Sequence, residues 1–462
     1  MKSYDLIVVG GGPGGYVAAI KAAQLKAKVA LVEADRVGGV CLNYGCIPTK
    51  TLLRSAKLYQ DILNAKTFGI DFTGGEASAS INWENLMIRK GKVVDKIVGG
   101  VEQLLKFNGI DVYKGFGTVT DAQTVSVNDE ILKGKNLIIA TGSSPQFPNI
   151  EGLQASREAG IVLDSTAAIS LKEQPKHVVI LGGGVIAVEF ATLFNSLGTK
   201  VTVLQRSDEI LKNEDSDVKA LIKRHLEETG VNIITGTSLK KIEGDRIHYT
   251  DSSGEHVCVA DKILASLGRT PNIKGLEALS LAMTKKGIKI DGHMRTSIPN
   301  VYAIGDVCGG MMLAHVASAE GIAAVENIMG KDEILDYHKI PSCIYSFPEV
   351  GAVGYTEESA IAAGFEVATS MFPLSANGKA MAEGETTGFV KIISDKKYGE
   401  VIGVHIVASH ATDMIAEAAG IMALEGTVYD LAKTVHPHPT LSEIVMEAAH
   451  GAVDKPIHLI KK

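Results

Sequence analysis

The sequence predicts an α/β fold with two Rossmann-like dinucleotide-binding units, followed by a C-terminal α+β unit. The first two units are predicted because a short apolar run leads into a glycine-rich turn twice, over residues 4–15 and 177–187. The third is predicted because alternating strand patterns appear after Pro341, at 365–372, 389–393 and 401–407, and helical patterns follow them. A chain of 462 residues has room for about three domains.

Composition limits the classes of function. The chain is 45% apolar and 21% charged, which is ordinary for a globular protein with a large core. A net charge of -7 and a pI near 6 argue against nucleic acid as a partner. No apolar run approaches the ~18 residues of a membrane span, and the N-terminus does not resemble a signal peptide. We therefore expect a cytoplasmic protein, in which a disulfide is usually catalytic or redox-sensing.

The first glycine-rich turn lies between two predicted strands, Tyr4–Val9 and Lys28–Val32, with a helix over Tyr16–Leu25. Such a turn lets the backbone approach a pyrophosphate, lets the helix pack on the strand, and leaves the helix N-terminus to hold the phosphates. An acid at the end of the second strand accepts from a ribose hydroxyl. The predicted site contains Gly10, Gly12, Gly14, Gly15 and Glu33.

Two cysteines, Cys41 and Cys46, stand five residues apart after this unit. Four intervening residues allow one helical turn and a bend, so the two sulfurs can meet. A bridge across so short a loop gains little from chain entropy, which makes it a poor structural staple and a plausible redox couple. A zinc site needs about two more Cys or His ligands in register, and none stand nearby. Spacing alone leaves a redox pair and two buried thiols as open alternatives.

The chain between the cysteines and the second turn reads as helices and strands of the first unit. The helix predicted over Trp83–Phe107 has Val93, Ile97, Val101 and Leu105 at helical spacing, which we interpret as a core stripe. The other predicted elements are a helix at 51–66 and strands at 110–120, 124–127 and 136–140, with Gly115 and Gly117 at a turn. The last strand runs into Thr141 and Gly142, and a linker follows to Gly152.

The second dinucleotide unit departs from the usual pattern at one position. Its turn has Gly182, Gly184 and Ala187, and its second strand, Lys200–Leu204, ends in Gln205-Arg206 instead of an acid. A carboxylate here selects a free ribose 2′-hydroxyl, whereas a nearby arginine accommodates a 2′-phosphate. Surface cations such as Arg206 and Lys212 usually form a solvated edge, and NADP use stays open as an alternative to NAD.

Three further segments carry predicted site residues. Leu264–Gly268 and Arg269 end the second unit, and the short strand Val301–Ile304 delivers Asp306 to a position suited to a polyol hydroxyl. Ala314 opens a helix that runs to Met329. His438 is followed five positions on by Glu443, a base with a carboxylate to orient it, as thiol chemistry requires.

Taken together, these motifs resemble the pyridine nucleotide–disulfide oxidoreductases over essentially the whole chain. The motifs that carry the resemblance are the first glycine-rich turn and the segments 39–50, 140–142, 182–189, 268–269, 302–306 and 436–443. Two segments favour the lipoamide branch of the family over glutathione reductase. They are the residues around the two cysteines and the C-terminal segment His-Pro-His-Pro-Thr-Leu-Ser-Glu. Mercuric and large thioredoxin reductases have a further redox pair at the C-terminus, but no cysteine follows Cys343 here.

The resemblance implies a division of the chain and a set of binding residues. It implies FAD-binding segments at 1–147 and 271–338, an NAD(P)-binding unit at 148–270, and a dimerisation domain at 339–462. The FAD residues implied are Gly10, Gly12, Gly14, Gly15, Glu33, Lys50, Gly115, Thr141, Gly142, Asp306 and Ala314. The NAD(P) residues implied are Gly182, Gly184, Ala187, Glu189, Gln205, Arg206, Gly268 and Arg269, and no metal is expected.

The resemblance also implies the chemistry. His438 takes a proton from dihydrolipoamide, the substrate thiolate attacks Cys41, and Cys46 leaves as a thiolate beside the flavin. Lys50 and Glu189 form an ion pair near the flavin. His438 reaches the cysteines of the other subunit, so a homodimer is expected. The chain begins at the flavin unit, so the lipoyl group is expected on another protein, the acyltransferase of a 2-oxo acid dehydrogenase or related complex.

Some residues depart from the family pattern or fall outside its machinery. Tyr44 stands between the cysteines where the family usually has a small aliphatic residue, and is expected to pack toward the flavin or to tune the pair. His436 is interpreted as structural or as part of the rim, and the backbone at His315 is expected to face the flavin. Cys258, Cys308 and Cys343 are expected to be ordinary thiols.

Two other functions remain open. An NADPH-dependent reductase of a small disulfide is supported by Gln205-Arg206, and a structural subunit of a lipoyl complex is disfavoured because it has no need of Cys41, Cys46, His438 and Glu443.

Overall fold

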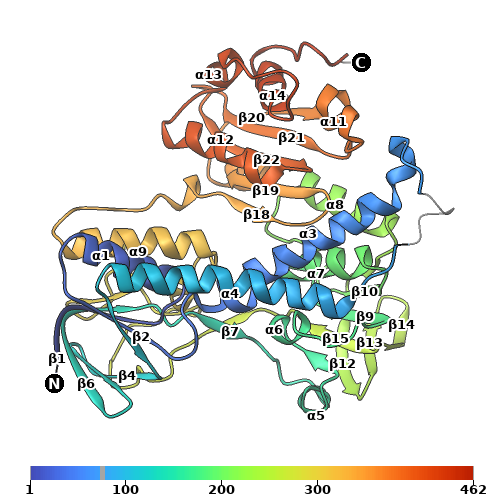
Figure 1. The fold of residues 1–462 in the computed structure, drawn as a ribbon. Coiled ribbons are helices and arrows are strands. Elements are labelled where there is room, and N and C mark those ends of the chain that lie inside the picture. The colour runs from blue at the N-terminus through green and yellow to red at the C-terminus, as the bar shows by residue number, and fades with distance from the viewer. Residues whose placement is uncertain (1, 73–78, 461–462) are drawn as a thin grey trace.

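The computed structural model describes residues 2–72 and 79–460 of the chain. Figure 1 shows two α/β units side by side and a third unit, formed by the C-terminal residues, above them. No helix in the described ranges is long and apolar enough to cross a membrane. The α/β fold with a separate C-terminal unit is the one that the sequence predicts.

The first unit is built on a sheet whose centre is β1 (Lys2–Val9). Buried apolar residues fill this strand, and parallel partners lie on both sides of it: β2 (Val29–Glu33) and β6 (Glu130–Ile139). The far-removed strand β17 (Val301–Ala303) pairs in parallel with β6, so the chain returns to this sheet after the second unit. The remaining strands are β3 (Asp111–Lys114), β4 (Gly117–Asp121) and β5 (Thr124–Val127).

Two helices pack closely over this sheet, α1 (Pro13–Gln24) and α9 (Ala314–Ile328), which lie side by side in Figure 1. Glycines permit the contact. A Cβ on Gly14 would lie 2.8 Å from the carbonyl oxygen of Ala317, and one on Gly321 would lie 2.6 Å from the carbonyl oxygen of Gly14. Gly14, which the sequence assigned to the cofactor, therefore has a helix-packing role in the structure.

The helices after β2 are α2 (Gly39–Tyr44), α3 (Cys46–Leu63), the 3₁₀ turn η1 (Ala65–Phe68) and α4 (Trp83–Phe107). Helix α3 begins at Cys46, earlier than the predicted Thr51. Gly45 alone separates it from α2. The bounds of α4 match the prediction, but its buried row is Val94, Val98, Val101 and Leu105. Val93 and Ile97 are half-buried, so the predicted core stripe was wrong by one residue over the first turns.

The second unit has a five-stranded parallel sheet in the order β11-β10-β9-β15-β8. The strands β9 (His177–Leu181) and β10 (Lys200–Leu204) have the predicted bounds and flank α7 (Val185–Ser196). The other elements of the unit are α5 (Leu153–Glu158), β8 (Val162–Leu163), α6 (Ser165–Ala168), α8 (Ser216–Glu228), β11 (Asn232–Ile234), β12 (Ser238–Glu243), β13 (Arg246–Asp251), β14 (Gly254–Val259) and β15 (Lys262–Ala265). The chain passes from the first unit to the second at β7 (Ser143–Pro145) and returns at β16 (Arg269–Pro271), and these two strands pair as an antiparallel ribbon.

The third unit is an antiparallel sheet in the order β18-β19-β22-β21-β20, covered by helices. Strands β20 (Val367–Pro373), β21 (Phe389–Asp395) and β22 (Val401–Ala408) lie where the alternation predicted them. Strands β18 (Ser342–Ile344) and β19 (Glu349–Gly354) were not predicted, because the first is short and glycines weaken the signal of the second. The helices of this unit are α10 (Glu357–Ala362), α11 (Gly378–Glu383), α12 (Ala411–Ala423), α13 (Val428–Lys433) and α14 (Glu443–Val453). Three further 3₁₀ turns follow η1 along the chain: η2 (Gly305–Cys308), η3 (Tyr337–Lys339) and η4 (Leu374–Ala376).

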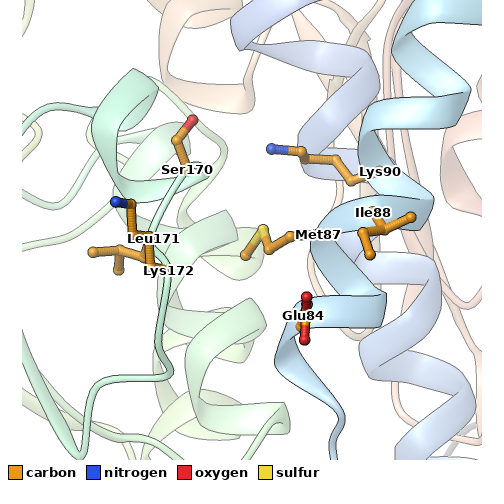
Figure 2. A pocket seen from close by; sticks show the side chains of 7 residues that line it. All are labelled: Glu84, Met87, Ile88, Lys90, Ser170, Leu171 and Lys172. Carbon is orange, nitrogen blue, oxygen red and sulfur yellow. The ribbon is translucent and has the colours of Figure 1, made fainter.

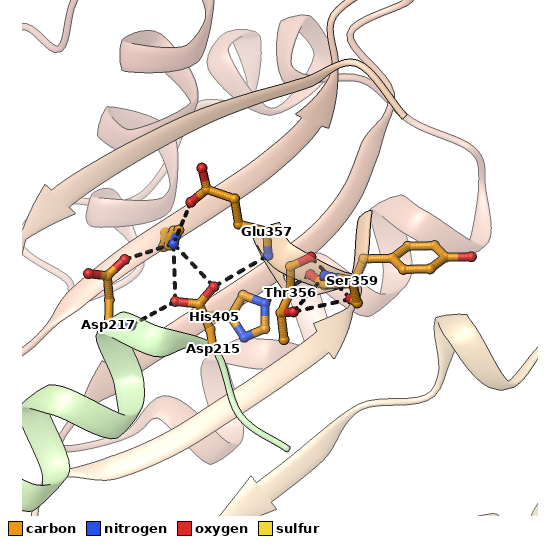
Figure 3. Close-up of polar contacts among 8 residues, drawn as sticks. Asp215, Asp217, Thr356, Glu357, Ser359 and His405 are labelled. Carbon is orange, nitrogen blue, oxygen red and sulfur yellow. Dashed lines mark hydrogen bonds and ion pairs between the residues drawn. The ribbon is translucent and has the colours of Figure 1, made fainter. Parts of the chain in front are cut away.

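A buried charge cluster ties the third unit to the second (Figure 3). Lys391 of β21 has a side chain only 4% exposed, and its Nζ lies 3.1 Å from Asp215, 2.7 Å from Asp217 and 2.9 Å from Glu357. Asp215 caps α8 by accepting from the backbone N–H of Asp217 at 3.0 Å. Because Asp215 and Asp217 come from the start of α8, whereas Lys391 and Glu357 belong to the third unit, the cluster fixes the nucleotide unit against the C-terminal sheet.

Candidate active site

The two predicted redox cysteines face each other across the break between α2 and α3. Both are half-buried free thiols, and the Cys41 thiol donates to the sulfur of Cys46. This hydrogen bond, followed by the charge of Lys50, lowers the pKa of Cys46 to about 7, against an opposing effect of burial. The same contact and burial raise the pKa of Cys41. Cys46 is therefore the more acidic thiol of the pair.

The predicted ion pair of Lys50 and Glu189 is present beside the cysteines. Lys50 Nζ, one turn after Cys46 on α3, donates to both carboxylate oxygens of Glu189 at 2.9 and 2.8 Å. Tyr345, which the sequence did not single out, completes the contact: its ring lies 4.4 Å from Lys50 Nζ, and its backbone N–H donates to Glu189 at 3.1 Å. No spacing or motif in the sequence pointed to this tyrosine.

The first glycine-rich turn has the geometry that a dinucleotide pyrophosphate requires. Gly10 has φ +103°, and a Cβ there would lie 2.2 Å from the carbonyl oxygen of Ala140. A Cβ on Gly15 would lie 1.8 Å from the carbonyl oxygen of Gly10. Gly12, by contrast, has no neighbour within 4 Å at its Cβ position and leads directly into α1. The backbone at the start of α1 is thus open to a phosphate, and the residues fit FAD.

Glu33 stands at the end of β2, where the sequence placed it. Its carboxylate accepts from the backbone N–H of Gly11 at 2.6 Å and from that of Asp35 at 2.8 Å. Its carbonyl oxygen accepts from the N–H of Gly115 at 2.8 Å, and Gly115 has φ +151° at the end of β3. The acid is held beside the glycine-rich turn, as ribose binding requires.

Asp306 lies on η2, directly after β17, among polar groups from the crossing ribbon. Its carboxylate accepts from Ser143 Oγ at 2.5 Å and lies 3.8 Å from Arg269 Nε. Arg269 also donates from Nη2 to the carbonyl oxygen of Ser143 at 2.7 Å. The structure therefore brings Arg269 to Asp306 of the first unit, and its predicted role at NAD(P) stays a prediction.

The neighbouring Thr141 and Gly142 form hydrogen bonds with Asn272, which follows β16. Thr141 Oγ1 donates to the carbonyl oxygen of Asn272 at 2.6 Å, and the N–H of Asn272 donates to the carbonyl oxygen of Gly142 at 2.9 Å. Ser143 and Asn272 are residues of this polar junction that the sequence did not single out.

The second glycine-rich turn repeats the geometry of the first. Gly182 has φ +109°, and a Cβ there would lie 2.3 Å from the carbonyl oxygen of Ser266, while Gly184 faces open space at the start of α7. Ala187 is fully buried, and Gly268 has φ +111°. These residues fit the pyrophosphate of a second dinucleotide.

Gln205 and Arg206 follow β10 at the position of the missing acid. Gln205 Nε2 donates to Ser207 Oγ at 2.5 Å and to the carbonyl oxygen of Glu209 at 3.0 Å, so the amide is held within its own loop. Arg206 is exposed, and so is Lys212. The geometry leaves the choice between a 2′-hydroxyl and a 2′-phosphate to these side chains.

His438 and Glu443 form the predicted base and carboxylate pair. His438 Nδ1 lies 2.9 Å from Glu443 Oε1, and the other carboxylate oxygen accepts from the N–H of Thr440 at 2.8 Å. Burial alone would raise the pKa of Glu443, but the hydrogen bonds from Thr440 and His438 hold it below its ordinary value. The imidazole of His438 is 78% exposed, so its other nitrogen faces solvent in the single chain.

The structure also shows the contacts of Tyr44, His315 and the other three cysteines, for which expectations were drawn from the sequence. Tyr44 donates to Asp35 at 2.7 Å, which turns it toward the loop after β2. His315 is exposed, with its Nε2 2.7 Å from the carbonyl oxygen of Pro341, and Ala314 starts α9 as expected. The thiols of the other cysteines are half-buried, and burial raises the pKa of each: Cys258, Cys308 and Cys343.

A cavity of about 550 Å³ opens between α4 and the loop after α6 (Figure 2). None of its seven lining residues is a predicted site residue, and the indole of Trp83 and the ammonium of Lys90 donate to loop carbonyls beside it. It is a junction between the first two units. Over residues 2–72 and 79–460, no group of three or more His, Cys, Asp or Glu side chains is placed to hold a metal ion.

Comparisons with known proteins agree with this geometry. The pyridine nucleotide-disulphide oxidoreductase family matches residues 4–321, and its dimerisation domain matches residues 340–449. A dihydrolipoyl dehydrogenase of Mycoplasma genitalium is 42% identical over 453 residues, which cover 97% of this chain and 98% of that one. A dihydrolipoyl dehydrogenase of Bacillus subtilis is also 42% identical, covering 98% of this chain and 99% of its own.

A solved structure shows the same architecture. The flavoprotein disulfide reductase RclA of Escherichia coli, as a Cu(II) complex, superposes with a TM-score of 0.86 at 26% identity, covering 97% of this chain and 99% of that one. The two glycine-rich turns, the facing cysteines and these matches lead to one conclusion: the chain belongs to the pyridine nucleotide-disulphide oxidoreductase family and is an FAD-dependent oxidoreductase that uses NAD.

Proposed function

We propose that the chain oxidises dihydrolipoyl groups carried by another protein to the cyclic disulfide, and passes the two electrons to NAD⁺. The observation that carries the proposal is the cysteine pair: Cys41 and Cys46 face each other, and the pKa of Cys46 is lowered to about 7 beside Lys50. This asymmetry suits dithiol–disulfide exchange, in which a thiol of low pKa leaves faster. The dihydrolipoyl dehydrogenases of M. genitalium and B. subtilis, each 42% identical over nearly the full length, support lipoyl substrates.

The proposed base is His438, acting through Nε2. Its Nδ1 is committed to Glu443, and because a carboxylate only accepts, Nδ1 holds the proton of the neutral imidazole. Nε2 is then the free acceptor, and it takes the proton of a substrate thiol. The carboxylate of Glu443 stabilises the imidazolium that forms.

The thiol exchange proceeds in two successive thiolate attacks, and it starts from the enzyme with a Cys41–Cys46 disulfide. The substrate thiolate attacks Cys41 Sγ, which breaks the Cys41–Cys46 bond, forms a mixed disulfide and releases Cys46 as a thiolate. The second substrate thiol, after losing its proton, attacks its own mixed-disulfide sulfur and releases Cys41, which is protonated. A leaving thiol with a low pKa leaves faster, which suits Cys46. FAD held at the turn of Gly10, Gly12 and Gly15 would supply the acceptor for the two electrons of the dithiol, and the turn of Gly182 and Gly184 would hold the NAD⁺ that receives them as hydride.

We further propose a homodimer in which His438 of each copy serves the cysteine pair of the other. The support is that His438 is 78% exposed and that its carboxylate partner lies in its own unit, while residues 340–449 match a dimerisation domain. The proposed division is FAD-binding at 1–147 and 271–338, NAD-binding at 148–270 and interface at 339–462. We place the protein in the cytoplasm, with the lipoyl-bearing acyltransferase of a 2-oxo acid dehydrogenase or related complex as its partner.

The test is nicotinamide reduction by the purified holoenzyme with dihydrolipoamide and either NAD⁺ or NADP⁺. Rapid reduction of NAD⁺ is expected, and Cys46→Ser is expected to retain bound flavin but to lose turnover. No reduction of either nucleotide, together with NADPH-dependent reduction of glutathione disulfide, would overturn the proposal in favour of a small-disulfide reductase. Lipoamide activity retained by Cys46→Ser would overturn the dithiol assignment.

A further inference from the structure

A second histidine–glutamate pair lies beside the proposed base. His436, two residues before His438, has a side chain only 5% exposed, although its neighbour Val435 is 91% exposed. His436 Nε2 lies 2.7 Å from Glu417 Oε1 on α12, and its Nδ1 lies 2.9 Å from the carbonyl oxygen of Thr434. The imidazole is thus turned inward and held at both nitrogens.

The two partners fix the charge of this ring. A backbone carbonyl only accepts hydrogen bonds, so Nδ1 of His436 must donate. A carboxylate also accepts, and of a carboxyl and an imidazole the imidazole has the higher ordinary pKa, so the shared proton belongs on Nε2. With a proton on both nitrogens, His436 is an imidazolium. The hydrogen bond to Glu417 raises the pKa of His436, in agreement with this geometry.

The charge lies close to the proposed catalytic pair. Residues two apart have Cα atoms within about 7 Å. Charged groups that act on His436 include Glu417 from α12 and Glu443 from α14, while the end of α13 contributes the Thr434 carbonyl. The coupling is mutual, because the charge of His436 also contributes to the lowered pKa of Glu443.

We propose that His436, held as an imidazolium by Glu417, is a positioning residue for His438. It anchors the loop 434–440 to α12, keeps Glu443 ionised to orient Nδ1 of His438, and disfavours a second positive charge on the loop. The role at His438 rests on the proposed function, whereas the charge of His436 does not.

The first test needs no substrate. The histidines of the holoenzyme are labelled with ¹⁵N, and their ring nitrogens are followed by NMR as the pH is varied, with His436 and His438 assigned through His436→Gln and His438→Gln. In the wild type, the His436 signals are expected to keep their imidazolium shifts above neutral pH. In Glu417→Gln, which removes the carboxylate at nearly constant shape, His436 is expected to lose its proton near neutral pH.

The second test measures the effect on the base. Removing the charge in Glu417→Gln or His436→Gln is expected to move the acidic limb of kcat/KM for dihydrolipoamide upward by roughly half a pH unit to one pH unit. His436→Lys, which restores a cation, is expected to return this limb toward its wild-type position. His248→Gln, which removes a histidine paired with Glu243 in the second unit, is the matched control and is expected to leave the limb where it is.

The outcomes separate the two proposals. A neutral His436 at neutral pH in the wild type, or an acidic limb of kcat/KM that does not move in Glu417→Gln, would overturn the positioning role, even if turnover falls through instability. A His436 that keeps its imidazolium shifts in the wild type and loses them in Glu417→Gln, in an enzyme that does not oxidise dihydrolipoamide, would instead overturn the proposed substrate and leave the charge of His436 intact.

Discussion

Lys50 Nζ donates to both carboxylate oxygens of Glu189, at 2.9 and 2.8 Å, and so joins the helix that begins at Cys46 to α7, the helix that follows the second glycine-rich turn. Glu189 is 7% exposed on its side chain and Lys50 is 29% exposed. The two charges act on the pKa of Cys46 in opposite directions: Lys50 lowers it and Glu189 raises it. The pair therefore tunes the thiolate as well as linking the two units.

Opposite substitutions in this pair should move the ionisation of Cys46 in opposite directions. Because the wild-type pKa of Cys46 is about 7, Lys50→Met should move its midpoint to higher pH and Glu189→Gln should move it to lower pH. The rate of iodoacetamide alkylation follows the thiolate fraction. The measurement is the pH dependence of alkylation at Cys46 in the reduced enzyme, assigned to the residue by mass spectrometry.

Lys57→Met is a control on the same helix, since Lys57 pairs with Asp61 and Glu385 instead of Glu189. It should leave the midpoint where it is. Parallel shifts in Lys50→Met and Glu189→Gln would show that the substitutions act through loosened packing and not through charge.

The glycine-rich turns and the buried parallel strands could be predicted from the sequence because each has a local cause. The strands at 177–181 and 200–204 are apolar runs that end at a glycine or at a polar pair, and the helix at 83–107 begins after Asn82, whose side chain caps it by accepting from Asn85. Lys50 and Glu189 were paired from the family resemblance, and the structure brings them together.

The features that were missed depend on contacts between segments far apart in the sequence. Tyr345, the residue after β18, meets Lys50 of α3, and nothing near position 345 in the sequence indicates this contact. The inward side of His436 depends on α12, nineteen residues earlier, which supplies Glu417. The expected core stripe of α4 differed from the buried row because the direction of the face is set by the elements that cover it.

Nucleotide preference should respond to a carboxylate at position 205. In Gln205→Glu, the side chain at the end of β10 can accept from a ribose 2′-hydroxyl and repels a 2′-phosphate. A charged hydrogen bond contributes about 1.5 to 3 kcal/mol, so the ratio of kcat/KM for NAD⁺ to that for NADP⁺ should rise by about tenfold or more. The measurement is steady-state kinetics with both nucleotides at a fixed dihydrolipoamide concentration.

Arg206→Ala is the companion variant, because Arg206 is exposed and its removal takes away a cation without adding a charge. It should lower kcat/KM for NADP⁺ and leave that for NAD⁺ nearly unchanged. An unchanged ratio in both variants would show that position 205 does not face the ribose.

Breaking the Lys391 cluster should destabilise the chain strongly. Lys391→Met leaves Asp215, which is fully buried, without its ammonium partner, and removing one member of a buried pair costs about 3 to 5 kcal/mol. The midpoint of urea denaturation should fall accordingly. Adding Asp215→Asn should recover part of the loss because it removes the unpaired buried charge.

Lys223→Met, which breaks an exposed pair with Glu227, should change the free energy of unfolding by less than about 0.5 kcal/mol. Equal losses in the Lys391 and Lys223 variants would contradict this reading of the cluster.

His405, which lies in the same cluster, should make stability depend on pH below neutrality (Figure 3). Its Nε2 lies 3.0 Å from the carbonyl oxygen of Tyr355 and must donate to it, and within the described residues its buried Nδ1 has no hydrogen-bond partner. Burial lowers the pKa of His405, so the folded chain holds this imidazole neutral. The unfolded chain binds a proton at the ordinary histidine pKa of about 6.5, and the folded chain does so only at lower pH.

The sign of the effect follows from linkage. Below about pH 6.5 the unfolded state binds more protons at position 405 than the folded state does, so stability falls as the pH falls through this range and is fully present above it. The lowered pKa of Asp215 makes a separate loss, but only at more acidic pH, near and below the ordinary aspartate value. His405→Gln, whose amide can still donate toward Tyr355, should flatten the decline in the urea midpoint between neutral pH and about pH 5.5. His248→Gln, at an exposed ion pair, should keep the wild-type slope. If His405→Gln declines as steeply as the wild type, the acid sensitivity comes from groups other than this buried imidazole.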